Sequence, residues 1–319
     1  MKASIYKKYG SPEVLQVAEI DKPSPKDKEV LIKIHYTTVN RTDTGFRSAE
    51  YIISRLFSGL FKPKQPVLGT EYSGVIEEIG KDVTRFKVGD EVFGINTFKF
   101  GTHAEYLCTN EQKTLAIKPT NMTFKEAAAV CEGLMLAINY VGRVDFKKNP
   151  KILINGASGS IGSAAVQLAK YYGAEITAVC NTKNMDLIKS LGADVVIDYL
   201  KEDFTQRDYK FDTVLDAVGK SSFFKCKKIL NPKGVYYSSE LGYMSQNVFL
   251  ALLTPIFSRK KVKFPIPTDS IKDILFFKEL IESGNYKAVI DRTYSLDEIV
   301  EATKYVETGE KTGNVVIKL

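Results

Sequence analysis

The hydrophobic and polar residues of this chain follow two periodicities, which change near residue 120. Before that point, short runs alternate between apolar and polar positions and are interrupted by Gly and Pro, as in residues 29–34 (EVLIKI) and 74–80 (GVIEEIG). Alternation with a period of two indicates strands that bury one face. Residues 88–92 place a Gly-Asp pair between two apolar runs, which is typical of a hairpin turn. This part of the chain is therefore predicted to be an all-β, folded-over barrel.

From residue 123 the pattern changes to apolar strands alternating with amphipathic helices. Thr123 and Glu126 form a capping-box pattern at the start of an Ala-rich helix that runs towards Tyr140. Strand-helix alternation at this spacing requires a parallel sheet covered on both faces. The predicted elements that follow are a strand at 151–155, a helix to 172, a strand at 175–180, a helix to 191, and strands at 195–199 and 211–218.

The last part of the chain carries two helical patterns, at 271–283 and 296–307, and a final strand at 314–319. We expect this tail to return to the first domain. A chain of 319 residues is long enough for two domains. The patterns together predict an α/β protein with a barrel domain from residues 1–122 and 260–319 and a doubly wound parallel-sheet domain from residues 123–259.

The most specific motif is a glycine-rich turn between a strand and a helix, at 152–162 (ILINGASGSIG). Small residues allow the backbone to approach a pyrophosphate, and the helix N-terminus supplies unpaired N–H groups and positive dipole charge. The turn departs from the G-x-G-x-x-G form, because Ala157 stands at the first position and a glycine precedes it. Phosphate binding is favoured over a purely geometric turn, and the residues predicted to bind the cofactor here are Gly156, Ser158, Gly159, Ser160, Ile161 and Gly162.

The end of the next strand bears on which dinucleotide is bound. An NAD-selective site usually places a carboxylate there for the ribose 2′-hydroxyl, but this chain has Asn181, Thr182 and Lys183 after Cys180. Lys183 suits a 2′-phosphate, with Asn181 and Thr182 as neutral donors. NADPH is therefore predicted in preference to NADH, the alternative being that Lys183 is an ordinary solvated lysine.

Composition and charge exclude several other classes of protein. The net charge of +7 comes from scattered lysines, so no nucleic-acid partner is expected. The four cysteines are widely separated and are predicted to be free thiols. No apolar run reaches the ~18 residues of a membrane span. Because a strand-like run follows Met1 almost at once, we expect no targeting segment and a cytoplasmic location.

The chain resembles the medium-chain dehydrogenase/reductase superfamily, and within it the zinc-independent quinone oxidoreductase branch. The resemblance covers essentially the whole chain, and it implies a GroES-like β-barrel catalytic domain built from both chain ends, an inserted Rossmann domain and a homodimer. It rests on the glycine turn together with residues 2–6, 12–15, 69–75 (GTEYSGV), 88–94 (VGDEVFG), 191–194 (LGAD) and 312–317 (TGNVVI).

The metal ligands of zinc-dependent relatives are missing from this chain. Their Cys-x-x-Asp stretch corresponds to residues 40–43 (NRTD), and their Gly-His-Glu stretch to 69–71 (GTE), so only Cys131 remains as a ligand. Catalytic zinc takes about three protein ligands. The resemblance therefore implies a site without zinc.

Without a Lewis acid, the acceptor must already be electrophilic. We expect hydride transfer to a quinone or to an α,β-unsaturated carbonyl, such as an enal or enone. Two alternatives stay open from the sequence. One is a nicotinamide-binding redox sensor or assembly factor with little turnover, and the other is a metal-free alcohol dehydrogenase.

The resemblance also implies roles for individual residues. Asn40 is expected beside the nicotinamide ribose, with Asp43 orienting its loop, and Tyr51 is a candidate for the substrate pocket, so these three are the catalytic candidates. No residue stands out as an essential acid or base. The remaining cofactor contacts implied are Tyr199 near the adenosine phosphate with Lys183, Val218 and Leu241 flanking the nicotinamide, and Lys311 from the C-terminal segment.

One further segment, at 248–263, is apolar over 248–257 (VFLALLTPIF) and basic over 258–263 (SRKKVK). A weak peripheral contact with an anionic membrane is one interpretation. The other, which we favour from sequence, is a helix packed at the substrate cleft or at a dimer interface.

Overall fold

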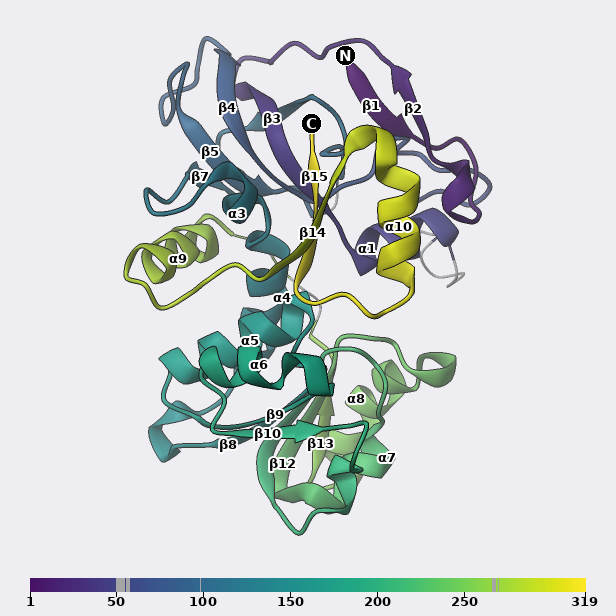
Figure 1. Ribbon diagram of the computed structural model, residues 1–319, viewed down its shortest axis with the longest axis vertical. Coiled ribbons are helices and arrows are strands. Elements are labelled where there is room, and N and C mark those ends of the chain that lie inside the picture. Colours follow the sequence, from purple (N-terminus) through teal and green to yellow (C-terminus); the bar gives the residue numbers. More distant parts are fainter. Residues whose placement is uncertain (50–54, 56–57, 98, 266–267, 269) are drawn as a thin grey trace. The chain divides into compact units, whose positions relative to one another are not determined.

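The structure is a computed structural model that describes residues 1–319 apart from 50–54, 56–57, 98, 266–267 and 269. The chain divides into two compact units (Figure 1). We call Met1–Glu132 with Asp269–Leu319 the barrel unit, and Gly133–Thr268 the Rossmann unit. The predicted α/β fold class, a barrel domain and a parallel-sheet domain, is confirmed.

The barrel unit is organised around a mostly antiparallel seven-stranded sheet, in the order β14-β15-β3-β4-β5-β7 with β6 also paired to β3. β3 is buried over most of its length, with Lys33 its one exposed position, and its pairing with β4 contains two register shifts, which bend the strand. The strands are β3 (Glu29–Val39), β4 (Glu71–Ile79), β5 (Glu91–Ile95), β6 (Tyr106–Asn110), β7 (Leu115–Ile117), β14 (Ile290–Ser295) and β15 (Asn314–Lys318), beside a small sheet of β1 (Lys2–Ile5) and β2 (Gln16–Glu19).

The C-terminal tail returns to this unit, as predicted, because β15 pairs antiparallel with β3. Apolar residues of β15 and of the last helix share a core with β3, including Val39, Ile299, Val306 and Val315. The helices of the unit are α1 (Arg41–Ser48), α3 (Phe124–Ala128), α9 (Ile271–Glu282) and α10 (Ile299–Glu307), with single-turn helices η1 (Pro12–Val14) and η7 (Leu296–Glu298).

The Rossmann unit is a six-stranded parallel sheet in the order β10-β9-β8-β11-β12-β13. The strand order reverses between β8 and β11, and ligands of open α/β sheets bind at the carboxyl ends of strands beside such a reversal. The strands are β8 (Lys151–Asn155), β9 (Glu175–Cys180), β10 (Val195–Asp198), β11 (Phe211–Asp216), β12 (Leu230–Ser238) and β13 (Lys261–Lys263).

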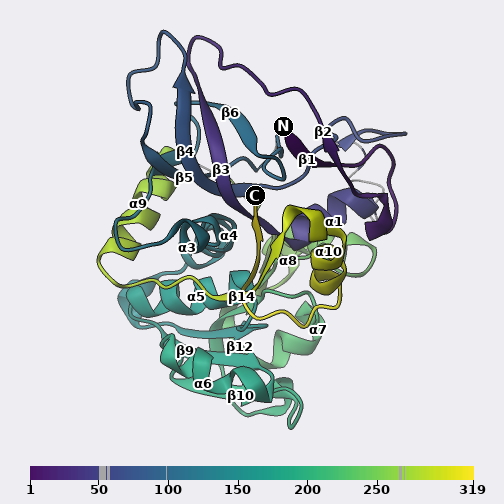
Figure 2. The ribbon, with the colours of Figure 1, turned by 45° about the horizontal axis from the view of Figure 1, so that its top comes forward.

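Helices accompany this sheet, as Figure 2 shows. They are α5 (Ser160–Tyr171), α6 (Met185–Ser190), α7 (Phe223–Cys226) and α8 (Gln246–Phe257), with single-turn helices η2 (Phe146–Lys148), η3 (Thr182–Asn184), η4 (Phe204–Gln206), η5 (Lys227–Ile229) and η6 (Tyr243–Ser245). α4 (Cys131–Val141) contains the point where the units divide. Among the described residues, no helix combines the length and apolar character needed to cross a bilayer.

The unit boundaries differ from the predicted ones at both ends. The predicted helix at 123–140 is two helices, α3 and α4, and α3 packs against β3 and β4 of the barrel unit. Its capping box is as predicted, with Glu126 Oε2 accepting from Thr123 N–H at 2.8 Å. At the other end, β13 pairs with β12, so residues 260–268 belong to the Rossmann unit. Both differences arise because a local pattern does not show which sheet an element packs on.

Candidate functional site

The glycine turn follows β8 at the reversal of strand order. Gly156 has a φ of +78°, a conformation that side chains rarely adopt, and its N–H donates to Val179 O at 3.1 Å. A Cβ on Gly162 would lie 2.2 Å from Gly156 O, so only glycine allows α5 to approach the turn this closely. By contrast, a Cβ on Gly159 would meet its nearest atom at 3.6 Å, an ordinary contact.

The same turn has polar groups suited to an anion. α5 is a 12-residue helix that begins at Ser160 with Gly159 as its N-cap, and a helix N-terminus presents unpaired N–H groups and positive dipole charge. The Ser160 hydroxyl is buried and has no hydrogen-bond partner among the described residues. An orphaned hydroxyl beside a glycine cradle fits the pyrophosphate of a dinucleotide. Ser158 and Ile161 belong to the same turn and first helical residues.

The next two strands bring the other adenosine-side candidates together. Asp198 at the end of β10 is in register with Cys180 at the end of β9, and Tyr199 N–H donates to Cys180 O at 3.1 Å. Lys183 is exposed in η3, and Asn181 is its N-cap. Tyr199 is also exposed, at 54%. These three side chains therefore border one region at the carboxyl ends of β9 and β10.

A carboxylate that the sequence reasoning missed lies in this region. Asp198 Oδ2 accepts from the Thr182 hydroxyl at 2.5 Å, and Oδ1 accepts from Leu200 N–H at 3.0 Å. Lys201 lies 3.7 Å from the same carboxylate. The hydrogen bond from Thr182 is the main reason why the pKa of Asp198 lies below its ordinary value. Asp198 thus shapes the loop that carries Lys183.

A second missed carboxylate, Asp216, organises the ends of β8 and β11. Asp216 is fully buried and accepts from Asn155 Nδ2 at 3.0 Å, Ser221 N–H at 2.8 Å and the Tyr236 hydroxyl at 3.1 Å. This network holds the segment that places Val218 against Gly156, where a Gly156 Cβ would lie 2.3 Å from Val218 Cγ1.

Leu241 follows β12 and is partly buried, and its carbonyl accepts from Asn247 N–H at 3.1 Å. Val218 and Leu241 are therefore both held at carboxyl ends of strands of the same sheet. Tyr51, the remaining candidate for the substrate pocket, lies outside the described residues.

A cluster of buried polar side chains lies in the barrel unit, centred on Glu132 at the start of α4. Glu132 Oε1 accepts from the Thr42 hydroxyl at 2.6 Å. Its Oε2 accepts from the Thr70 hydroxyl and from Asn40 Nδ2, both at 2.5 Å. Thr70 and Asn40 are buried, whereas Thr42 is only half-buried.

Glu71, on β4, completes this cluster. Its Oε1 accepts from Thr38 Oγ1 at 2.7 Å and from Asn40 Nδ2 at 3.3 Å, and its Oε2 accepts from Glu132 N–H at 2.8 Å. Asn40 Nδ2 is thus engaged with both carboxylates, which fixes the amide within the barrel unit. Asn40 is a positioning residue in this geometry.

Burial dominates the electrostatics of the pair. Burial raises the pKa of both Glu71 and Glu132, and a neighbouring negative charge adds to the effect, from Glu132 on Glu71 and from Asp43 on Glu132. Burial also lowers the pKa of Lys311 to about 8, which Glu132 and Glu71 partly oppose. Lys311 therefore lies close to this cluster, and its Nζ donates to Gly313 O at 2.5 Å.

Asp43 fixes the start of α1 by accepting hydrogen bonds from two backbone N–H groups. Its Oδ2 accepts from Asn40 N–H at 2.8 Å and its Oδ1 from Gly69 N–H at 2.9 Å. Burial raises its pKa to about 7. His103 Nε2 lies 3.9 Å from Asp43 but hydrogen-bonds to Thr38 O at 2.8 Å. Because burial lowers the pKa of His103 to about 4, the imidazole is neutral and the two do not form an ion pair.

These residues do not fit a zinc site. Asn40 and Thr70 stand at two of the ligand positions of zinc-dependent relatives, and both donate hydrogen bonds to carboxylates instead of offering a lone pair. Burial raises the pKa of the Cys131 thiol well above its ordinary value, which disfavours the thiolate that binds zinc. No group of three or more metal-binding side chains is found in the described part of the chain.

Glu132 and Glu71 were missed as site residues because their partners are remote in sequence. Glu132 meets Asn40 across 92 positions and Thr70 across 62. The signal available was an acidic residue within an otherwise apolar helix start, VCEGLML, which would need buried partners.

The barrel, the reversed parallel sheet and the glycine turn define a two-domain oxidoreductase of the dehydrogenase type. A family model described as alcohol dehydrogenase GroES-like domain matches residues 26–139, and one described as zinc-binding dehydrogenase matches 191–317. The chain belongs to the medium-chain dehydrogenase/reductase superfamily, in its quinone oxidoreductase-like branch.

Three similar proteins illustrate the branch. The 2-methylene-furan-3-one reductase of Solanum lycopersicum is 35% identical over 329 residues, which cover 99% of this chain and 79% of that protein. The chloroplastic NADPH-dependent alkenal/one oxidoreductase of Arabidopsis thaliana is 32% identical, with the same coverage. The structure of the quinone oxidoreductase from Coxiella burnetii superposes with a TM-score of 0.89 at 26% identity, covering 100% of this chain and 99% of that one.

Proposed function

We propose that this enzyme uses NADPH to reduce quinones or α,β-unsaturated carbonyls without a metal ion. The observation that carries the proposal is the Asn40–Glu71–Glu132 cluster, in which hydrogen bonds between side chains occupy the ligand positions of zinc-dependent relatives. With no Lewis acid to polarise a simple carbonyl or alcohol, the acceptor must be activated by its own conjugation. The names of two relatives, an alkenal/one oxidoreductase and a quinone oxidoreductase, support this acceptor class.

The Rossmann unit would hold the cofactor, which when bound supplies a hydride from its nicotinamide ring. The glycine turn and the Ser160 hydroxyl would bind the pyrophosphate. Lys183, with Asn181 and Tyr199 beside it, would bind the 2′-phosphate, and this supports NADPH over NADH. Val218 and Leu241 would border the nicotinamide.

The proton that completes the reduction would come from solvent or from a nearby hydroxyl, because the Glu132 carboxylate is occupied as a hydrogen-bond acceptor. Among the donors to that carboxylate, Thr42 is the half-buried one, so its hydroxyl is the candidate group for this transfer. Positioning of the reactants then supplies much of the rate.

We also propose a homodimer, as the resemblance implies, and the open edge of the Rossmann sheet supports it, since β13 is the last strand in the sheet order. Light scattering after gel filtration tests this state. Cytoplasmic location remains a prediction from the sequence.

A steady-state assay tests the function. Protein purified in the presence of a chelator is mixed with NADPH and a series of naphthoquinones, short enals and enones, and its zinc content is measured in parallel. We expect turnover with conjugated acceptors, background rates with saturated aldehydes, and less than about twofold loss after chelation. NADPH binding with background turnover on every acceptor would instead indicate a sensor or assembly factor, and NADP-dependent oxidation of alcohols would indicate a metal-free alcohol dehydrogenase.

A further inference from the structure

One helix of the Rossmann unit, α8, exposes apolar side chains on its outer face. α8 contains no charged residue in its 12 positions, QNVFLALLTPIF. Its inner face consists of Asn247, Leu250, Ala251 and Thr254, at the spacing of one helical stripe. Leu250 and Ala251 pack against the core of the unit, and Asn247 and Thr254 are buried.

The outer face of α8 is exposed, and it is apolar as well. Its exposed residues retain between half and four-fifths of their surface: Phe249 60%, Leu252 68%, Leu253 50%, Ile256 73% and Phe257 79%. Exposed apolar residues that gather on one element mark a contact surface, unlike the isolated ones that any protein carries.

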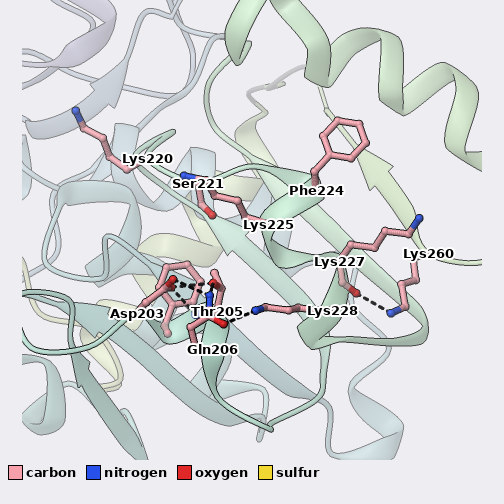
Figure 3. Close-up of a pocket in the computed structure, with 11 residues that line it drawn as sticks. Asp203, Thr205, Gln206, Lys220, Ser221, Phe224, Lys225, Lys227, Lys228 and Lys260 are labelled. Atoms are coloured by element: carbon pink, nitrogen blue, oxygen red, sulfur yellow. Dashed lines mark hydrogen bonds between the residues drawn. The ribbon is translucent and has the colours of Figure 1, made fainter.

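A lysine-rich hollow adjoins this helix. α7 and α8 lie side by side in Figures 1 and 2, and both pack on the same core cluster. Figure 3 shows the hollow, which is lined by Lys220, Lys225, Lys227, Lys228, Lys260 and the half-exposed ring of Phe224.

The hollow is strongly positive. None of its five lysines forms an ion pair with a carboxylate in the described part of the chain. Two ammonium groups have neutral partners instead: Lys260 Nζ donates to Lys227 O, and Lys228 Nζ to Gln206 Oε1, each at 2.6 Å. Asp203, the carboxylate of the lining, accepts from Thr205 N–H at 2.9 Å.

β13 follows α8 along the chain and is tied to it by a hydrogen bond. Val262 N–H donates to Thr254 Oγ1 at 2.9 Å, which ties the strand to the helix. Lys261 and Lys263 are exposed on either side of the buried Val262. Because Val262 packs in the core that α8 covers, Lys261 and Lys263 face the other side of the sheet. Lys260, close after the end of α8, belongs to the lysine hollow, so the apolar helix face and the hollow together form the surface that we call the α8 surface.

We propose that the α8 surface docks on a lipid bilayer that contains anionic headgroups, with α8 lying in the plane of the interface. Hydrocarbon at the headgroup boundary would cover the apolar outer face, and lipid phosphates and carboxylates would neutralise the lysines. A second copy on this face would bring the same positive charges, whereas the homodimer proposed above would pair at the β13 edge. A nucleic acid would leave the helix uncovered, so the bilayer is the occupant whose chemistry complements both parts. This surface goes beyond the reductase activity and does not depend on it.

Vesicle sedimentation tests the proposal. We expect the full-length protein to co-sediment with phosphatidylcholine vesicles that contain phosphatidylserine, and to stay in the supernatant with phosphatidylcholine alone. Reversal of three lysines (Lys225→Glu, Lys227→Glu, Lys260→Glu) should weaken binding at least about tenfold, because each basic residue near the surface contributes attraction. The pair Leu252→Asn, Ile256→Asn should weaken it by a similar factor while the charge is unchanged.

Two controls carry the same kinds of substitution at single exposed positions elsewhere. Lys189→Glu alters an exposed lysine of α6, and Leu275→Asn alters an exposed leucine of α9. Both should bind vesicles like the wild type, and thermal unfolding verifies that every variant folds.

The molar mass of the wild type and of the α8 variants, measured by light scattering, separates the bilayer from a second copy. The proposal stands if the apolar variants lose vesicle binding without changing mass. The proposal is overturned if the wild type does not bind anionic vesicles or if the lysine reversal binds them like the wild type. It is also overturned if the variant Leu252→Asn, Ile256→Asn is a monomer while the wild type is a dimer, since the helix would then be a subunit interface.

Discussion

The glycine turn of the Rossmann unit and the polar cluster of the barrel unit differ in whether their polar groups have hydrogen-bond partners. In the turn, the absence of a side chain at Gly162 allows α5 to lie close to the end of β8, and the Ser160 hydroxyl has no partner among the described residues. In the cluster, by contrast, Glu132 and Glu71 accept hydrogen bonds from hydroxyl, amide and backbone donors, so their oxygens are occupied.

The difference suggests different tasks. A site with an unpaired donor gains free energy when an anion arrives, whereas a site with satisfied partners gains little and instead holds its own geometry. We therefore assign ligand binding to the turn and positioning to the cluster, and the expected effects of mutation differ in kind between them.

The largest effect is expected in the turn, from Gly162→Ala. The added Cβ would lie 2.2 Å from Gly156 O, and overpacking against backbone costs about 1–3 kcal/mol. The helix must shift from the turn, so NADPH affinity should fall by up to about 100-fold, measured by isothermal titration.

Gly159→Ala is the control for this variant, because the same methyl group meets its nearest atom at 3.6 Å and φ is −76°. It should bind NADPH within about threefold of the wild type. Equal losses in both variants would mean that the close approach of α5 is not what creates the phosphate site.

In the cluster, Glu132→Ala should act mainly on stability. It removes the acceptor of Thr42, Thr70 and Asn40, and leaving buried donors unsatisfied costs about 1–3 kcal/mol. We expect a loss of about 2 kcal/mol in the free energy of unfolding, measured with urea.

Glu132→Gln keeps the shape and one acceptor oxygen, so it should cost less than half as much as the alanine variant. If the alanine variant were as stable as the wild type, the cluster would not be holding its geometry through these bonds. An exposed site, Glu301→Ala, should change stability by less than about 0.5 kcal/mol.

The cluster should also make stability depend on pH. Burial raises the pKa of Asp43 to about 7, above the value of the unfolded chain, and raises those of Glu71 and Glu132. The folded protein then binds more protons than the unfolded chain between about pH 4 and 7. Stability is therefore fully present below this range and declines as the pH rises through 7.

We expect the free energy of unfolding to fall by about 1 kcal/mol or more between pH 5.5 and 7. Asp43→Asn should flatten this decline, since it removes one of the titrating groups. A stability that rises over the same interval would show that hydrogen bonds outweigh burial and that the carboxylates are ionised throughout.

The two regions also differed in how far the sequence predicted them. The glycine turn was visible because its determinants are contiguous: strand, glycines and helix lie within residues 152–172, and β8 and β9 have the predicted bounds. Periodicity likewise located most strands and the return of β15 to the barrel. These features depend on local backbone geometry, which neighbouring residues determine.

The polar cluster was not visible because it depends on packing between distant segments. Asn40 and Asp43 were candidates only through the family resemblance, and the one local signal for the pair, an acidic residue at an apolar helix start, does not name the partners of Glu132 or point to Glu71. The same limit explains the unit boundaries: α3 follows a correct capping box at Thr123 but packs on β3 and β4, and no pattern within the helix determines that choice.

A smaller effect on cofactor binding than that of Gly162→Ala distinguishes the side chains around the turn from its backbone. Lys183→Ala should raise the KM for NADPH about tenfold, equivalent to about 1.4 kcal/mol, and leave the KM for NADH within about twofold, because a charge-assisted bond to the 2′-phosphate is lost only with the phosphorylated cofactor. Lys189→Ala, at an exposed position on the next helix, controls for a general loss of positive charge and should change neither constant. Equal increases for both cofactors would place the preference elsewhere in the loop that Asp198 and Thr182 hold. A selective increase would show that the backbone of the turn binds any dinucleotide, while one side chain at the end of β9 selects the phosphorylated one.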